Sequence, residues 1–332
     1  MTVKRFGAFV AAALMIVGAV FLRSWLDNRE DNSTSASDGS AVDDPSRPGD
    51  IDLLCSTEFT VVCDKLRSSG YEATSEPAGQ TLDRLKAADA AELPDVWLTV
   101  DPFPAMLDEY RTRSATPLPA AIKGTPQSLG AAQPVMAVPQ VRAAALATAC
   151  PEPANSSCVV GLIGKNWSEL DASTASGPVL LGIDDPESTA SGLLALAHAI
   201  AGRLGSLDLT GAVSDSGVLG LTRSLADGTE TFGAGGALTT MIGRTSLVNL
   251  AFATSADTAG TPSGGRLDYE QLVVGPAFPV IAVWAVIGED DPALRRAVTA
   301  ALTSAGWASS SGAPSLSAST FIQLRQLWKD NT

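Results

Sequence analysis

The chain has 332 residues, 45% of them hydrophobic, which is enough to bury the core of one large or two medium domains. Its formal net charge is −14, with 36 acidic against 22 basic residues. Because binding to nucleic acid requires a basic surface that neutralises phosphates, this charge argues against nucleic-acid partners and favours neutral, cationic or small ones.

The N-terminal segment differs in kind from the rest of the chain. An unbroken run of apolar and small residues covers 6–22 and ends at Arg23. As a helix it extends roughly 26 Å, sufficient for a thin bilayer and longer than an ordinary signal-peptide core. No small-residue cleavage site follows it. We therefore predict an uncleaved signal anchor at residues 6–23, with residues 1–5 in the cytoplasm and the rest outside the cytoplasmic membrane. A cleaved secretion signal is the alternative.

A polar segment follows the anchor. Residues 27–50 consist mainly of Ser, Asp, Gly, Pro and other polar residues, with almost nothing to bury. We predict that residues 24–50 form a disordered linker that holds the folded part away from the bilayer.

In the folded part, short apolar runs alternate with helical periodicity from residue 51 onward, which is the pattern of an α/β protein. In chain order we predict strand 51–54, helix 59–68, helix 82–91, strand 96–100, helix 104–110, strand 133–139, helix 141–149, strand 179–183 with an apolar helix after it, helices 217–225 and 236–242, strands 247–254, 272–274 and 280–287, and helices 293–304 and 319–328.

The four cysteines form two pairs with the same separation of eight. An exported location allows both pairs to oxidise. Cys150 and Cys158 enclose a polar loop that a disulfide would close, and Cys55 with Cys63 would tie a strand end to the following helix, although the sequence does not exclude crossed pairs. Zinc is the rival interpretation. It is disfavoured because the spacing fits no C-x-x-C arrangement and the only histidine, His198, lies in an apolar helical stretch. We predict no metal site and no cofactor.

The most informative segment is the strand, turn and helix at residues 179–205. Ser188, Thr189 and Ser191 offer hydroxyl groups in the turn, and Gly192 allows a close approach of another backbone. The free N–H groups at a helix start carry a partial positive charge, so this turn is a candidate ligand site. The alternative is that Ser188 or Thr189 only caps the helix.

The order of these units resembles the type 2 periplasmic-binding-protein fold, especially extracellular solute-binding proteins related to the molybdate-binding type. The resemblance covers residues 51–331. It implies an α/β fold of two lobes joined by two crossing strands, here preceded by one transmembrane helix, with lobe 1 at residues 51–138 and 272–332 and lobe 2 at residues 139–271. The segments that carry it are CSTEFTVVCDKL, PDVWLTVDPFPAML, WSEL with GIDDPESTASGLLALAHA, LVNLAFATSAD and VVGPAFPVIAVWAVIGEDDPALRRAVTAAL.

The resemblance also implies a ligand cleft between the lobes, formed by the turns that follow the strands. Glu58 and Asp101 depart from an anion-binding pattern, because a carboxylate repels an anion in a cleft by on the order of 1 kcal/mol or more. Either these side chains point away or the ligand is neutral or cationic. The implied ligand-binding residues are Ser56, Thr57, Thr99, Asp101, Ser188, Thr189, Ser191, Thr254 and Ser255.

The sequence contains none of the common catalytic motifs: no G-x-S-x-G, no P-loop and no H-E-x-x-H. We therefore predict that the chain is not an enzyme. The predicted function is a membrane-anchored extracytoplasmic solute-binding protein that holds a small polar ligand in the interlobe cleft and feeds a transporter. The alternative is a non-catalytic interaction or structural module of the cell envelope, built on the same fold but without a small-molecule ligand.

Overall fold

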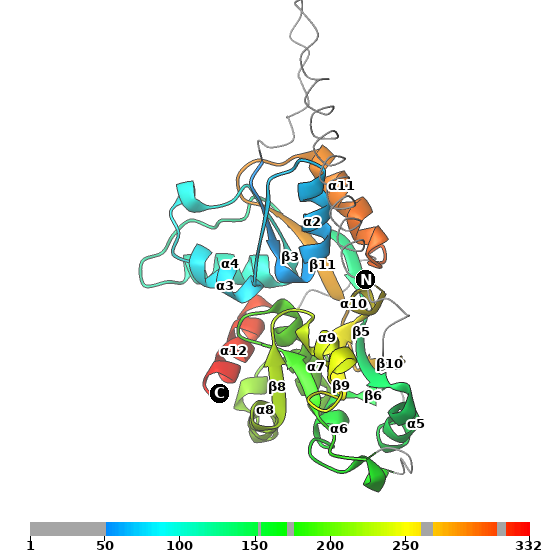
Figure 1. Ribbon diagram of the computed structural model, residues 1–332. Coiled ribbons are helices and arrows are strands. Elements are labelled where there is room, and N and C mark those ends of the chain that lie inside the picture. The colour runs from blue at the N-terminus through cyan, green and yellow to red at the C-terminus, as the bar shows by residue number, and fades with distance from the viewer. Residues whose placement is uncertain (1–50, 152–153, 171–175, 260–267, 311–316) are drawn as a thin grey trace, which may run out of the picture. The chain divides into compact units, whose positions relative to one another are not determined.

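The computed structural model describes residues 51–151, 154–170, 176–259, 268–310 and 317–332 (Figure 1). The predicted anchor at residues 6–23 and the predicted linker at 24–50 lie outside these ranges. Within them, no helix has both the length and the apolar character needed to cross a membrane.

The first sheet has five strands in the order β2-β1-β3-β11-β4. β1 pairs in parallel with β2 and β3, while β11 runs antiparallel between β3 and β4. Every residue of β1 and β3 is buried, as expected of apolar strands covered on both faces. The strands are β1 (Leu53–Ser56), β2 (Ala73–Glu76), β3 (Val96–Val100), β4 (Gln127–Ala132) and β11 (Val280–Val286).

Helices cover both faces of this sheet. α2 (Thr60–Ser68) and α11 (Pro292–Ser304) pack together on one side, and α3 (Ala78–Leu85) and α4 (Phe103–Thr112) on the other (Figure 1).

The second sheet has six strands in the order β6-β10-β5-β9-β7-β8. β7 pairs in parallel with β8 and β9, whereas β5 is antiparallel to both β9 and β10. The strands are β5 (Pro134–Pro139), β6 (Ala154–Asn155), β7 (Leu181–Asp184), β8 (Thr229–Phe232), β9 (Leu250–Thr254) and β10 (Tyr269–Gly275). The helices in this part of the chain are α5 (Gln140–Ala149), α6 (Ser156–Val160), α7 (Ala190–Leu204), α8 (Ser216–Gly228), α9 (Gly236–Gly243) and α10 (Ser255–Ala259).

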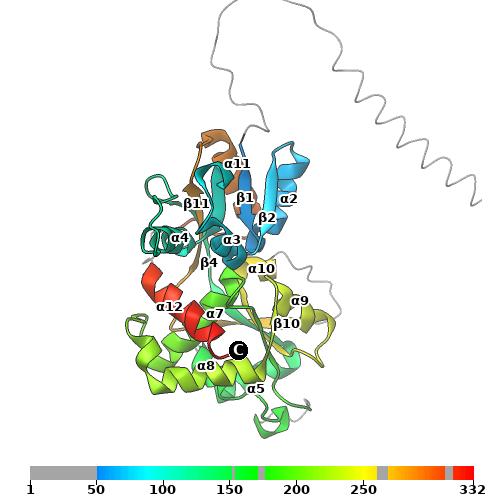
Figure 2. The same cartoon turned by 90° about the vertical axis from the view of Figure 1, so that its left-hand side faces the viewer.

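α7 is the central helix of this second part. Almost its whole length is buried, and it ends at Gly205, whose φ of 65° is the left-handed conformation that terminates many helices. The C-terminal helix α12 (Ala318–Lys329) lies beside α7 and also contacts α4, so it touches helices that belong to both sheets (Figure 2).

The chain changes sheet twice. It leaves the first sheet after Ala132 and enters the second at Pro134, and it returns between Gly275 and Val280. The predicted lobe boundaries, near 138 and 272, lie a few residues from these changes and remain a prediction.

Most predicted elements coincide with observed ones to within a few residues, and β3 matches its predicted range. The helix predicted at 82–91 is wrong in its limits, since α3 occupies Ala78–Leu85 and Ala90–Glu92 forms a separate 3-10 turn. The short strands β2, β4 and β8 were not predicted. Each lies at a sheet edge and has few buried residues, so it lacks the apolar run that marks a central strand.

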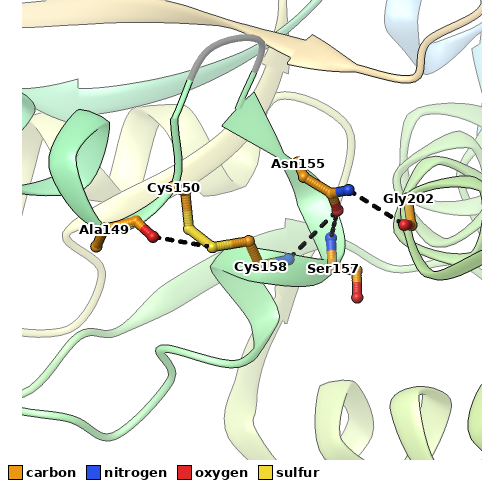
Figure 3. The surroundings of a disulfide bond; sticks show 6 residues. All are labelled: Ala149, Cys150, Asn155, Ser157, Cys158 and Gly202. Carbon is orange, nitrogen blue, oxygen red and sulfur yellow. Dashed lines mark hydrogen bonds between the residues drawn. A yellow bond between two sulfur atoms is a disulfide. The ribbon is translucent and has the colours of Figure 1, made fainter. Parts of the chain in front are cut away.

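Both predicted disulfides are confirmed. Cys55 pairs with Cys63, linking β1 to α2, and Cys150 pairs with Cys158, linking the end of α5 to α6 (Figure 3). Asn155 supports the second link, because its Oδ1 accepts from the N–H of Cys158 at 3.3 Å while its Nδ2 donates to the Gly202 carbonyl of α7 at 3.1 Å (Figure 3).

Candidate functional site

A cavity of about 520 Å³ opens where the carboxyl ends of β1 and β9 approach the start of α7. This volume is typical of a small-molecule site. Side chains that follow strands of both sheets line it. Its polar lining includes Thr57, Glu58, Ser191, Thr254 and Asp257, and its apolar lining includes Leu238, Val280 and Trp307.

The turn before α7 forms its own hydrogen bonds. Thr189 Oγ1 accepts from the Gly192 N–H at 3.0 Å and donates to the Asp185 carbonyl at 2.8 Å, so this residue caps the helix. The Ser188 carbonyl accepts from the Gly79 N–H of α3 at 2.9 Å. Gly192 is required by its own turn, because a Cβ there would meet the backbone of Asp184 and Asp185. Ser188 and Thr189 therefore shape the turn and do not line the cavity.

Glu58 occupies the N-terminus of α7. Its Oε1 accepts from the N–H groups of Ala190 at 2.7 Å and Ser191 at 3.1 Å. These are the free N–H groups at which an anion would otherwise bind. Glu58 Oε2 is shielded from solvent and has no hydrogen-bond partner, although the residue as a whole is half-buried. Burial raises the pKa of Glu58, and the hydrogen bonds from Ser191 and Ala190 oppose that shift. Glu58 is one of the residues that line the cavity.

Asp184 links the same helix start to the segment before α9 and its first turn. Its Oδ2 accepts from Ser191 Oγ at 2.7 Å and from the Gly235 N–H at 2.8 Å, and its Oδ1 accepts from the Ala237 N–H at 3.2 Å. Burial raises the pKa of Asp184 to about 7. Adjacent acids in a turn are ordinarily solvated, but β7 continues through Asp184 and places its side chain inside.

A third carboxylate belongs to the turn after β9. Asp257 Oδ2 accepts from the Thr254 N–H at 2.8 Å and from Thr254 Oγ1 at 2.9 Å. Burial raises the pKa of Asp257, and the hydrogen bonds from Thr254 oppose the shift. Ser255 lies beside it but faces another way, since its Oγ accepts from the Gln133 N–H at 3.0 Å.

Of the nine predicted ligand-binding residues, the structure brings three to the cavity: Thr57, Ser191 and Thr254. Ser56 and Thr99 lie in the core, where Ser56 Oγ donates to Thr99 Oγ1 at 2.7 Å. The backbone of Asp101 donates to the Ile281 carbonyl of β11 at 3.0 Å. The cavity is not lined by Asp101, nor by Ser188, Thr189 or Ser255. Sequence reasoning missed Asp184 and Asp257. The signal that could have found them is an acid at or just after the end of an apolar strand.

The sole histidine is not available for proton transfer. His198 is completely buried on α7, and its ring stacks on Phe278 with 4.1 Å between centroids. Burial lowers the pKa of His198 to about 3, so the ring is neutral.

A second, larger depression of about 720 Å³ is formed by α3, α4, the loop after α4 and α12. None of its lining residues is buried. It therefore lacks the enclosed polar groups that orient a ligand, and the smaller cavity is the candidate site.

The raised pKa of Asp184 predicts a pH-dependent stability. The unfolded carboxyl ionises near its ordinary value of 3.8 and the folded one near 7, so its stabilising contribution, complete below pH 3.8, is lost as the pH rises to about 7. The slope reaches about 1.4 kcal/mol per pH unit. In Asp184→Asn this contribution is absent. Urea unfolding from pH 4 to pH 8 should therefore show a weaker decline in the variant, and parallel curves would contradict the assignment.

No protein-family model matches the chain, and no curated protein matches it in sequence. Solved structures match the chain in fold. A periplasmic thiamin binding protein has a TM-score of 0.53 and 12% identity, with 88% of this chain and 98% of that chain covered. Iron-bound HitA from Pseudomonas aeruginosa has a TM-score of 0.53 and 12% identity, with 85% of this chain and 99% of that chain covered. The Azotobacter vinelandii periplasmic molybdate-binding protein has a TM-score of 0.45 and 13% identity, with 79% of this chain and 100% of that chain covered.

At such low identity this likeness shows the fold alone. The chain has the two-sheet α/β fold of type 2 periplasmic binding proteins, which confirms that part of the prediction. The molybdate-binding structure scores too low to support the narrower resemblance.

Proposed function

We propose that the chain is an extracytoplasmic solute-binding protein that holds a small polar ligand in the cavity between β1, β9 and α7 and releases it unchanged. The observation that carries this proposal is the cavity lined by turns from both sheets, in the position where open α/β sheets bind ligands. Two disulfides fit an oxidising compartment. The anchor at residues 6–23 and a transporter partner complete the proposal.

Binding would act through closure of the two halves around the ligand. The chain changes sheet at Gln133 and between Gly275 and Val280, so a rotation at these segments would move one sheet against the other. A ligand that contacts both halves stabilises the closed arrangement by its differential affinity. The bond between Glu58 and α7 already crosses from one half to the other.

Thr57 offers a direct test of the site. Thr57 lines the cavity, and its Oγ1 is buried and has no hydrogen-bond partner in the protein. Thr57→Val therefore removes no internal hydrogen bond, and we expect unchanged or higher stability. Ligand affinity should fall about tenfold if this hydroxyl binds the ligand. Thr148→Val is the control, because Thr148 lies on α5 outside the cavity and its Oγ1 donates to the Ala144 carbonyl at 2.9 Å, so this change should affect stability more than affinity.

The ligand for this test comes from a thermal-shift screen of the full-length protein against oxyanions, amino acids, polyamines and sugars. A ligand at 100 times its dissociation constant stabilises by about 2.7 kcal/mol. No stabilisation by any solute would reject the proposal in favour of the envelope interaction module, whose partner would then be sought among envelope proteins.

A further inference from the structure

The anion position at α7 is already filled. Glu58 Oε1 takes the N–H groups of Ala190 and Ser191, so the partial positive charge of the helix start is neutralised from within the protein. An incoming oxyanion would have to displace this carboxylate and then lie beside it. The cavity therefore does not offer a helix N-terminus to a ligand.

The remaining charges in the cavity are mainly negative. Glu58 and Asp257 both line it, and the negative charge of Asp257 acts in the same direction as burial in raising the pKa of Glu58. Among the described residues that line the cavity, Lys65 is the only basic one. Its exposed side chain reaches α11 at the edge of the cavity, where Nζ donates to Ser304 Oγ, another lining residue, at 3.2 Å.

Two acceptor atoms at this place have no partner. Glu58 Oε2 and Thr57 Oγ1 are both shielded from solvent without a hydrogen bond. A buried carboxylate oxygen in that condition is unfavourable unless a donor or a cation reaches it. Both atoms belong to the same turn after β1, whose residues Thr57 and Glu58 line the cavity.

A metal ion does not fit these groups. The described part of the chain contains no group of three or more His, Cys, Asp or Glu able to hold one. Magnesium and calcium require six or more oxygen ligands, and zinc requires about four. An ammonium group needs fewer acceptors, because it has three donors at most. The apolar wall formed by Leu238, Val280 and Trp307 suits the carbon part of an organic molecule.

We propose that the ligand carries a positively charged amino group that binds Glu58 Oε2, Thr57 Oγ1 and the Asp257 carboxylate, so that the cavity selects organic ammonium compounds over anions. This inference rests on the proposed function, because it names the ligand class of that same cavity.

The test compares cations with anions of similar size on the full-length protein. The probes are phenethylamine and putrescine, matched by 3-phenylpropionate and succinate. We expect the melting temperature to rise with at least one amine and with neither carboxylate. Calorimetry should then show a loss of amine affinity of about tenfold or more in Glu58→Gln, since a charge-assisted hydrogen bond disappears.

Two further variants keep the result interpretable. Asp257→Asn should also weaken amine binding. Glu270→Gln, an exposed residue of β10 outside the cavity, should leave it unchanged. Gln at position 58 retains a carbonyl oxygen that can accept from the α7 N–H groups, so the variant keeps the helix contact.

The outcomes separate this inference from the proposed function. Stabilisation by a carboxylate or sugar but by neither amine, or amine affinity unchanged in both Glu58→Gln and Asp257→Asn, overturns the cation preference and leaves the solute-binding role intact. Absence of stabilisation by these probes and by every solute of the wider screen overturns both.

Discussion

Gly192→Ala is expected to destabilise the protein by about 3 kcal/mol or more. An added Cβ would lie 2.5 Å from the carbonyl carbon of Asp185 and would also overlap the backbone of Asp184. Ordinary contact begins at 3.4 Å. Backbone atoms cannot rotate away as a side chain can, so the turn before α7 would have to shift. That shift would pull the helix start away from Glu58 and Asp184.

The change in the free energy of unfolding is measured by urea denaturation. Gly220→Ala in α8 is the matched control, because a Cβ at that position meets nothing within 4 Å. Alanine is the better helix former, so this control should equal or exceed the stability of the wild type by up to about 1 kcal/mol. If Gly192→Ala unfolds within about 0.5 kcal/mol of the wild type, the close packing of this turn is refuted.

The same turn shows how far sequence reasoning reaches. The apolar run, the Ser/Thr-rich turn and the apolar helix predicted β7 and α7, because these signals are local. The capping function of Thr189 was among the predicted alternatives and is confirmed. The occupant of the helix start was not predicted. Glu58 lies 132 positions before Ala190, and no local pattern encodes a contact between such distant segments.

Polar residues at strand ends were predicted less well than the strands themselves. Ser56 and Thr99 each follow an apolar run, but β1 and β3 are adjacent in the sheet, so the two hydroxyls bond to each other inside the core. Strand adjacency decides whether a hydroxyl faces a ligand or a neighbouring strand. The sequence predicts that such residues gather at one edge of the sheets, but not which of them reach the cavity.

Arg325→Met is the second large effect, expected to lower stability by about 3 kcal/mol. The side chain is 9% exposed and joins α12 to three other groups. Nε donates to the Glu187 carbonyl at 2.8 Å, and Nη2 donates to the Gly79 carbonyl at 3.2 Å and to Asp83 Oδ2 at 2.6 Å. Methionine retains the apolar bulk but leaves two carbonyls without this donor. Asp83 is half-exposed, so water compensates it in part.

Arg84→Met is the control for the loss of a positive charge, because its ion pair with Glu76 is partly exposed, 47% for the Arg84 side chain and 26% for Glu76, and should contribute less than about 1 kcal/mol. The pH dependence adds a second readout. Burial of Asp83 opposes ionisation, but the hydrogen bonds from Arg325 and Lys86 lower its pKa to about 2. The stabilisation that the ionised Asp83 carboxylate contributes is therefore present above pH 3.8 and is lost as the pH falls toward 2. The stability difference between wild type and Arg325→Met should therefore narrow below pH 4, whereas a constant difference would mean that the arginine acts only through the two carbonyls.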